Sequence, residues 1–359
     1  MLDTARSALS LFFEMSESNE QAMAARLSAA GFDDITLGDV LLLAALQMRG
    51  RSAPGSRPKP KIDRAVSREM TDKLFLRGYL EDRSAPHHPD RTVVALTSRG
   101  RSAVEVATDG VLADRWASFP FRPGDIVISA PRRSGAALVQ TICALLIFQT
   151  PHLPAPLSAL SPWLDDPGTL CHEVFGQYAA QRHRRFIKTH SPLSAIPSVP
   201  EVTYIAIGRK PLDIAWLAAG PGSPAKPSPL LGVLRHVSDA WARRAEPNVV
   251  LMHYDDLFAD LEGQLRLLAA RLGITVSDDV WSGLVKAATL EQMYAAEGPV
   301  EPFPNHPEDD RADVRKGAPE SGAAPLTGTE LADYHARVAE VLEPDVLAWL
   351  GRVRSNEHG

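Results

Sequence analysis

Cysteine is scarce in this sequence of 359 residues, which contains only Cys143 and Cys171. Two cysteines, one of them inside an apolar helical run, do not make a disulfide framework, and redox chemistry is not indicated. A zinc-binding pattern is lacking as well, because the pair His172 and Glu173 has no second histidine at the spacing H-E-x-x-H. We therefore expect no metal.

Long hydrophobic runs are also lacking. The longest one, residues 138–148, is interrupted by Gln140 and Thr141 and is far shorter than the roughly 20 residues needed to cross a bilayer. The first fifteen residues include Asp3 and Glu14 and have no basic start that leads into an apolar stretch. These absences predict a cytoplasmic protein without a membrane partner.

The net charge is modest, but its distribution is uneven. The chain carries a formal charge of −6, yet between Arg49 and Arg101 thirteen basic residues face six acidic ones, which gives this segment a charge of +7. A basic segment on an acidic chain is typical of a contact with a polyanion such as DNA. A solvated surface explains the same charges equally well, and both interpretations stay open.

Length and composition predict two domains. A chain of 359 residues exceeds what one hydrophobic core usually serves, and an apolar content of 45% is enough for two cores. The basic, mainly helical pattern of the first hundred residues gives way to short apolar strands after residue 121. We therefore expect one domain over residues 1–115 and a second over residues 116–359.

The first hundred residues alternate between helical and extended patterns. Apolar residues at helical spacing predict a helix over residues 33–49, with Thr36 available as its cap, and a second over residues 61–77, which Gly78 ends. Extended runs over residues 79–83 and 91–96 flank a turn and predict a hairpin. Thr97 is the predicted cap of a further helix.

This order of elements resembles the MarR-like transcription regulators over residues 36–106, most closely in the stretch AVSREMTDKLFLRGYLEDRSAPHHPDRTVVALTSRGRSAV. The resemblance implies an α+β winged-helix domain with a recognition helix, a two-stranded wing and a homodimer. Residues 50–60 depart from the family, because three prolines and two glycines cannot form the regular helix that precedes a recognition helix. DNA binding and a purely dimerising or docking module both remain open.

The pattern changes from residue 121 onward. Short apolar runs at residues 125–129, in RRFIKTH, in VTYIAIG and in NVVLMHY alternate with helical stretches. Such alternation predicts an α/β fold, a parallel sheet covered by helices on both faces. Ligands of such sheets bind at the carboxyl ends of the strands, so the residues that follow each strand are the candidates for a site.

The first of these strands leads into APRRSGAALVQTICALLIF. Arginines, a small turn at Ser134 and Gly135, and the free N–H groups at the start of a helix together favour an anion. The Walker A pattern G-x-x-x-x-G-K-[ST] is absent, which removes most of the support for nucleoside triphosphate chemistry. An arginine-rich turn without a ligand is the alternative that this loop alone leaves open.

Six stretches resemble the sulfotransferases that use 3′-phosphoadenosine-5′-phosphosulfate (PAPS), over residues 121–350. The loop after the first strand is similar to the family's P-P-K-S-G-T-T-W, RFIKTHSPL to K-T-H-x-P, IGRKPLDIAW to G-R-D-P-x-D-V-A-x-S and VRKGAPESG to R-K-G; SPWLDD and NVVLMHYDDLF are also similar to bacterial members. The resemblance implies a P-loop-like sulfotransferase domain that moves a sulfuryl group from PAPS to a hydroxyl of a small molecule. It implies that catalysis uses His190 as the general base together with Lys188 and Arg133, and that the nucleotide is bound by Arg132, Arg133, Ser134, Gly135, Ala136, Ala137, Leu138, Arg209, Arg315, Lys316 and Gly317.

The sequence departs from the family where hydroxyl groups are expected to hold the nucleotide. Ala136 and Ala137 replace two hydroxyl residues, Leu138 replaces a common tryptophan, and Leu217 replaces a serine. Each hydrogen bond to a charged partner contributes about 1.5–3 kcal/mol, so three missing hydroxyls weaken a direct copy of the family's site. A MarR-like regulator that uses a degenerate sulfotransferase domain as a ligand sensor, and an inactive scaffold, are therefore the alternatives to an enzyme.

Overall fold

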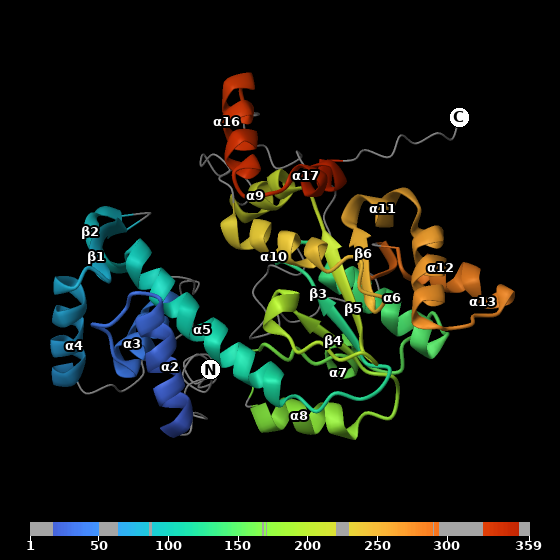
Figure 1. The fold of residues 1–359 in the computed structure, drawn as a ribbon, viewed down its shortest axis with the longest axis horizontal. Helices are drawn as coiled ribbons and strands as arrows, with labels where there is room; N and C mark the ends of the chain where they lie inside the picture. The colour runs from blue at the N-terminus through green and yellow to red at the C-terminus, as the bar shows by residue number, and fades with distance from the viewer. Residues whose placement is uncertain are drawn as a thin grey trace. The chain divides into compact units, whose positions relative to one another are not determined.

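The computed structural model describes residues 17–49, 64–85, 88–166, 169, 171–219, 230–289, 291–293 and 326–351 (Figure 1). The chain divides into two compact units. One comprises Met1–Phe119 with Asp166–Val174, and the other comprises Pro120–Asp165 with Phe175–Gly359.

Among its described residues, the N-terminal unit contains three helices, a hairpin and a long helix in chain order. They are α2 (Glu17–Ala29), α3 (Leu37–Arg49), α4 (Arg64–Leu76), β1 (Leu80–Ala85), β2 (His88–Leu96) and α5 (Ser98–Ser118). β1 and β2 pair antiparallel, with Leu80 opposite Leu96. Residues 50–63, which include the proline-rich segment, lie outside the described residues.

Side-chain caps set two of these helix boundaries. The helix predicted to start at residue 33 begins at Leu37, because the Thr36 hydroxyl accepts a hydrogen bond from the Asp39 N–H (3.3 Å) and the Asp39 carboxylate accepts one from the Thr36 N–H (3.0 Å). The predicted cap of α5 is confirmed, since Thr97 Oγ1 accepts from the Gly100 N–H at 3.1 Å. The strands continue into the stretch predicted as the turn, which corrects the shorter strands expected there.

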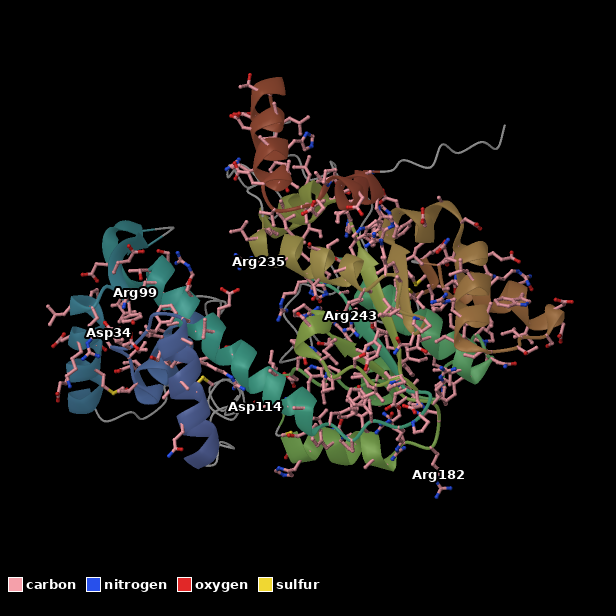
Figure 2. All side chains as sticks on the ribbon, in the orientation of Figure 1. Asp34, Arg99, Asp114, Arg182, Arg235 and Arg243 are labelled. Carbon is pink, nitrogen blue, oxygen red and sulfur yellow. The ribbon has the colours of Figure 1, made fainter. Side chains whose placement is uncertain are left out.

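Polar clusters surround the apolar core of the N-terminal unit. The core contains Leu43, Leu74 and Tyr79, each with no exposed surface. The Tyr79 hydroxyl donates to Asp34 at 2.6 Å, and the Arg99 guanidinium donates to the same carboxylate at 2.9 Å; Figure 2 labels Asp34 and Arg99 in this unit. These contacts tie the start of α5 to the segment ahead of α3.

The C-terminal unit contains a four-stranded sheet in which all neighbours are parallel. The strands are β3 (Ile126–Ser129), β4 (Phe186–Thr189), β5 (Thr203–Gly208) and β6 (Val249–His253), in the order β4-β3-β5-β6. The predicted parallel α/β sheet is confirmed. Because β3 lies between β4 and β5, the chain leaves β3 at the point where the strand order reverses, which is where such sheets bind ligands.

Helices cover both faces of this sheet. Ile126 and Ile128 belong to a buried cluster with α6 (Ala136–Phe148), α12 (Leu261–Leu272) and α13 (Asp278–Ala287). Side chains alternate along a strand, so Ser129 points to the opposite face, where it contacts α10 (Leu231–Ala242). The other helices in the described part of the unit are α7 (Leu157–Leu160), α8 (Cys171–Ala180), which begins in the other unit, η1 (Leu193–Ala195), α9 (Pro211–Ala219), α11 (Tyr254–Ala259), α16 (Gly328–Ala339) and α17 (Pro344–Gly351).

Both cysteine residues lie in helices. Cys143 is buried inside α6, and burial raises the pKa of its thiol to about 12, whereas Cys171 is half-buried at the start of α8. Across the described residues, no helix is both long enough and apolar enough to span a membrane.

Candidate functional site

The strands place four segments at one edge of the sheet. β3 leads into residues 130–135, β4 ends with Lys188 and Thr189 and leads into His190, β5 leads into Arg209, and β6 leads into Tyr254. The register pairs Ser129 with Thr189 on one side and with Ala206 on the other, so these strand ends lie side by side. The predicted site residues on these segments therefore meet at a single edge.

The loop after β3 has the conformation of an anion cradle. Arg133 and Gly135 both have positive φ angles, of 65° and 92°, and Gly135 is the N-cap of α6 without a side-chain cap. Ser134 has no exposed surface, and its hydroxyl has no hydrogen-bond partner among the described residues. The N–H groups at the start of α6 and a buried hydroxyl together suit a phosphate or sulfate group.

Arg209 and Tyr254 contact this loop and hold it in place. Arg209 is only 1% exposed, and its Nη1 donates to the carbonyl oxygen of Arg133 at 2.8 Å. The Arg209 guanidinium carbon lies 3.8 Å from the centroid of the Tyr254 ring, a cation–π distance. The edge of the same ring packs against Gly135 so closely that an added Cβ would lie 2.8 Å from one of its carbons. Position 135 therefore requires glycine for two reasons: its φ angle is positive, and a larger side chain does not fit beside the Tyr254 ring.

We expect the substitution Gly135→Ala to lower the free energy of unfolding by about 2–5 kcal/mol. A positive φ costs an alanine about 1–2 kcal/mol, and forcing a methyl group against the buried Tyr254 ring adds about 1–3 kcal/mol. Urea unfolding measures the loss. Gly273→Ala is the matched control, because Gly273 also has a positive φ of 65° but has open space around its Cβ position. Equal losses in the two variants would contradict the proposed clash.

Lys188 and His190 stand at the end of β4. Lys188 is 3% exposed, and the ring of His190 is held by a hydrogen bond between its Nδ1 and the carbonyl oxygen of Ala130, at 2.8 Å. A carbonyl oxygen can only accept, so Nδ1 carries the hydrogen. The basic lone pair of the neutral imidazole is consequently on Nε2.

Three of the candidate residues contact the same aromatic ring. The ring of Trp163, in the segment SPWLDD, lies 5.7 Å from Lys188 Nζ, 5.5 Å from the Arg132 guanidinium carbon and, edge to face, 5.6 Å from the ring of His190. These distances place two cations and the imidazole around the indole. Trp163 thus marks the side of the site where Arg132 is exposed.

Asp165 fixes the backbone on which His190 is carried. Its carboxylate is 5% exposed, accepts a hydrogen bond from the Thr189 hydroxyl and accepts another from the His190 N–H at 3.0 Å. Thr189 Oγ1 in turn accepts from the Ser191 N–H at 2.8 Å. The segment 189–191 is thereby held on one side by a buried carboxylate.

A buried histidine lies on the other side of this segment. Nε2 of His236, on α10, is 2.9 Å from the hydroxyl of Ser129, and the ring is 5% exposed. Burial lowers the pKa of His236 from its ordinary 6.5 to about 4, while Asp239 and backbone hydrogen bonds to His190 and Ser129 act in the opposite direction. His236 is therefore neutral at physiological pH.

The depressed pKa of His236 predicts a loss of stability in acid. Between pH 6.5 and about 4 the unfolded chain binds a proton at this ring and the folded protein does not, so the contribution is complete above pH 6.5 and is lost as the pH falls through this window. At 1.36 kcal/mol per pH unit the loss approaches about 3 kcal/mol. Urea unfolding at pH 7 and pH 4.5 measures it. The variant His236→Gln should lack this part of the pH dependence, and an unchanged dependence would disprove the assignment.

The structure brings together all described residues of the predicted site but distinguishes their side chains. Ala136 and Leu138 are 1% and 2% exposed and pack in the apolar cluster, so they can offer the site only their backbone N–H groups, whereas Ala137 is half-buried. Arg315, Lys316 and Gly317 lie outside the described residues, as does the side chain of Leu217. The sequence interpretation assigned no role to Trp163, Asp165, His236 or Tyr254, although three of them belong to segments it had matched.

Comparison with known proteins gives a consistent result. A family model described as "Sulfotransferase domain" matches residues 123–216 and 232–320, about half of the chain. A glycolipid sulfotransferase of Mycobacterium bovis (strain BCG / Pasteur 1173P2) is 32% identical over 298 residues, which cover 66% of this chain and 90% of that protein. One from Mycobacterium tuberculosis (strain ATCC 25618 / H37Rv) is 32% identical over 297 residues, with the same coverage. The solved structure of mouse sulfotransferase SULT7A1 complexed with PAP has a TM-score of 0.49 and 18% identity, and covers 67% of this chain and 92% of that one.

Proposed function

Since this chain belongs to the sulfotransferase family, we propose that its C-terminal unit transfers a sulfuryl group from PAPS to a hydroxyl of a small-molecule or glycolipid acceptor. The observation that carries the proposal is the meeting of the anion cradle, Lys188 and the Nε2 side of His190 at the carboxyl ends of β3 and β4. Such a site can bind a charged donor and remove a proton beside it. These are the two tasks that sulfuryl transfer to a hydroxyl demands.

The loop after β3 fits the phosphosulfate part of the donor. Bound PAPS supplies a sulfuryl group attached to a phosphate. The buried Ser134 hydroxyl can donate a hydrogen bond and has no acceptor among the described residues. The N–H groups at the start of α6 point out of the helix, and Arg133 lies in the same turn. Arg209, which the family resemblance assigns to the 3′-phosphate, supports the turn through the Arg133 carbonyl. The match of the family model extends to residue 320 and so includes Arg315–Gly317.

The loss of hydroxyl side chains is less severe in this geometry than a copy of the family's loop suggests. Of the two alanines that replace hydroxyl residues in this turn, Ala136 faces the core, where a hydroxyl could not reach an anion in front of the helix, so only the half-buried Ala137 costs the turn a hydroxyl. Backbone N–H groups at a helix N-terminus bind anions whatever the side chain. This supports donor binding by the turn, with Ser134 as its side-chain hydroxyl.

His190 and Lys188 divide the chemistry between them. The Nδ1–H of His190 is anchored to Ala130, so Nε2 accepts the proton of the acceptor hydroxyl as its oxygen attacks. Lys188, buried at the end of β4, neutralises negative charge that develops on the transferred and leaving oxygens. Arg133 adds a second cation in the turn. The remaining contribution is positioning, which converts the encounter of two bound substrates into a single step.

The acceptor side is marked by Trp163 and the exposed Arg132. An indole face beside the base offers a surface for stacking a ring of the acceptor. The curated relatives are named as glycolipid sulfotransferases, so a sugar hydroxyl of a glycolipid is the first acceptor to test. Simple hydroxylated small molecules form the second arm of the same panel.

The proposal is tested by incubating the purified full chain with PAPS and this acceptor panel. We expect release of 3′,5′-bisphosphoadenosine that depends on the acceptor. In parallel, the bisphosphate alone should raise the melting temperature, because a ligand that binds the folded state stabilises it. Absence of release above the background of the His190→Ala variant for every acceptor would refute the enzyme. Binding of the bisphosphate without turnover would favour the ligand-sensor alternative.

For the N-terminal unit, we propose a winged helix that dimerises and contacts DNA. Its support is the order of α3, α4, the β1–β2 hairpin and α5, together with the charge of +7 over residues 49–101. A gel-shift experiment at low salt with the DNA that flanks its own gene should show binding that salt weakens. No binding at low salt would leave the unit as a docking or dimerising module.

A further inference from the structure

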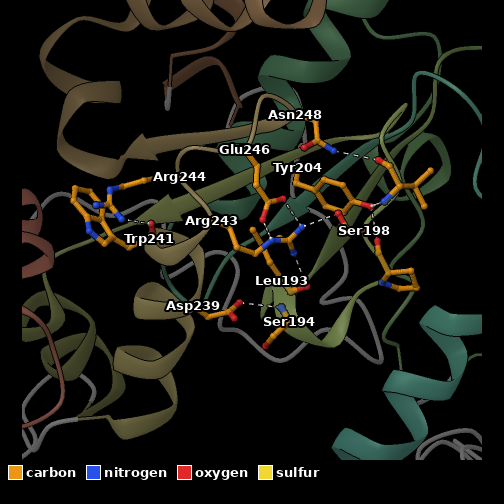
Figure 3. A network of polar contacts seen from close by, with 12 residues as sticks. Leu193, Ser194, Ser198, Tyr204, Asp239, Trp241, Arg243, Arg244, Glu246 and Asn248 are labelled. Carbon is orange, nitrogen blue, oxygen red and sulfur yellow. Dashed lines mark hydrogen bonds and ion pairs between the residues drawn. The ribbon is translucent and has the colours of Figure 1, made fainter.

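One face of α10 holds the chain that follows β4. His236, Asp239 and Arg243 are spaced by three and four residues, so they lie along the same side of the helix. Asp239 and Arg243 contact the segment that leads away from His190, and His236 contacts Ser129, whose hydroxyl donates to Ser191 of that segment. Figure 3 shows the outer part of this arrangement, around Asp239 and Arg243.

The outer contacts fix residues 193–198. Asp239 accepts a hydrogen bond from the Ser194 N–H at 3.0 Å. Arg243 donates from Nη1 to the Leu193 carbonyl oxygen at 2.9 Å and from Nη2 to the Ser198 hydroxyl at 3.1 Å. The guanidinium is itself held by Glu246, to which Nε donates at 2.9 Å. Helix and segment are therefore joined at several points beyond η1.

The inner contact lies beside the reaction centre. Ser129 Oγ donates to the Ser191 carbonyl oxygen at 2.8 Å, because that oxygen can only accept. A hydroxyl has a single hydrogen, so toward His236, 2.9 Å away, Ser129 Oγ acts as the acceptor and Nε2 of His236 as the donor. The imidazole thus sets the direction of the Ser129 hydroxyl.

We propose that His236 is a positioning residue for His190. Its Nε2–H orients the Ser129 hydroxyl toward the Ser191 carbonyl, and this fixes the backbone on which the His190 imidazole is carried. The inference rests on the proposed role of His190 as the base. His236 does not touch the substrates, since Ser129 and the backbone of residues 190–191 lie between its ring and the site.

The contact between Ser129 and His236 restrains the backbone of residues 190–191 in a way that the other contacts of His190 do not. Asp165 holds the backbone N–H of His190, and Ala130 holds its Nδ1. The carbonyl side of the segment is held by Ser129 and His236. Without the Nε2–H donor, the Ser129 hydroxyl can rotate away from Ser191. A displacement of about 1 Å at a catalytic group can lower a rate by roughly 100-fold.

Steady-state kinetics of three variants test the proposal. His236→Gln keeps an N–H donor at a similar reach, His236→Leu removes it, and Ser129→Ala removes its partner. We expect kcat to fall about 10- to 100-fold in the Leu and Ala variants, to recover most of this in the Gln variant, and KM for PAPS to stay within about twofold. The two losses should not add in the double variant, because both remove the same link. His183→Gln, a half-buried histidine at the opposite end of β4, is the control.

A second readout does not depend on turnover. In protein labelled with ¹⁵N-histidine, the Nδ1–H signal of His190 should shift or broaden in His236→Leu and should be preserved in His236→Gln. Wild-type kcat and an unchanged His190 signal in His236→Leu would overturn the proposal, as would equal losses in the Gln and Leu variants. If the Leu variant does not fold, His236→Asn, whose amide falls short of Ser129, takes its place. An inactive wild-type protein would refute the proposed function instead, and the His190 signal would then decide this inference alone.

Discussion

The substitution His190→Ala is expected to lower kcat by about 100- to 10,000-fold while KM for PAPS changes little. General bases contribute factors of this size, and His190 is the group whose basic nitrogen the Ala130 carbonyl directs into the site. In the proposed site the donor is bound by the turn after β3 and by Arg209, which the substitution leaves in place. Initial rates at saturating acceptor, with PAPS varied, separate the two parameters.

The loss of an imidazole elsewhere provides the control for this expectation. His183 is half-buried at the amino end of β4, where its ring packs edge to face against Phe148 at 5.0 Å, and His183→Ala should keep the wild-type kcat. His190→Gln keeps polarity but cannot accept a proton, so it should be as slow as the alanine variant. A rapid glutamine variant would show that His190 only forms hydrogen bonds and that the base is another group.

Local chemistry explains which elements the sequence could predict. Thr97 caps α5 and Gly78 follows α4 with a φ of 73°, both as their residue types require. The apolar runs became strands, because short runs rich in β-branched residues and bounded by turn residues favour an extended, buried conformation. The errors occurred at boundaries. The start of α3 depended on which of several polar residues ahead of it would form the cap, and that is decided by the reciprocal contact between Thr36 and Asp39.

The residues of the candidate site also form two groups: those that the sequence could place and those that only the structure reveals. Lys188, His190 and Arg209 could be placed at one edge from the sequence because each lies at or directly after the carboxyl end of a strand, and strand ends meet in a parallel sheet. His236 could not, because its role depends on α10 crossing behind Ser129, 107 residues earlier in the chain. The same holds for Tyr254, whose contact with Gly135 exists only once β6 is placed beside β5. Short polar motifs identify groups that act, and tertiary packing decides which groups hold them in place.

The largest loss of stability is expected at the opposite end of the sheet, where Asp125 and Arg185 precede β3 and β4. Their side chains are 2% and 1% exposed. Arg185 donates from Nε to Asp125 Oδ1 at 2.8 Å, from Nη2 to Oδ2, and from Nη2 to the Pro120 carbonyl oxygen at 2.8 Å. Asp125 also accepts from the Arg122 N–H at 2.7 Å. Both charges of this pair have partners. Removal of one residue therefore leaves the charge of the other buried without a partner and poorly hydrated.

We therefore expect Arg185→Met to lower the free energy of unfolding by about 3–5 kcal/mol, because it leaves the Asp125 carboxylate buried and uncompensated. Arg185→Lys keeps the charge but not the two-pronged geometry and should lose less. The double variant Asp125→Asn with Arg185→Met removes both charges and should recover part of the loss. Denaturant unfolding followed by tryptophan fluorescence measures all three, with Glu262→Gln as the control, since its pair with Arg266 is about half exposed and is worth under about 1 kcal/mol. A loss as small as that of the control would mean that water reaches Asp125, and the pair would then no longer explain why the amino ends of β3 and β4 stay aligned while their carboxyl ends carry the chemistry.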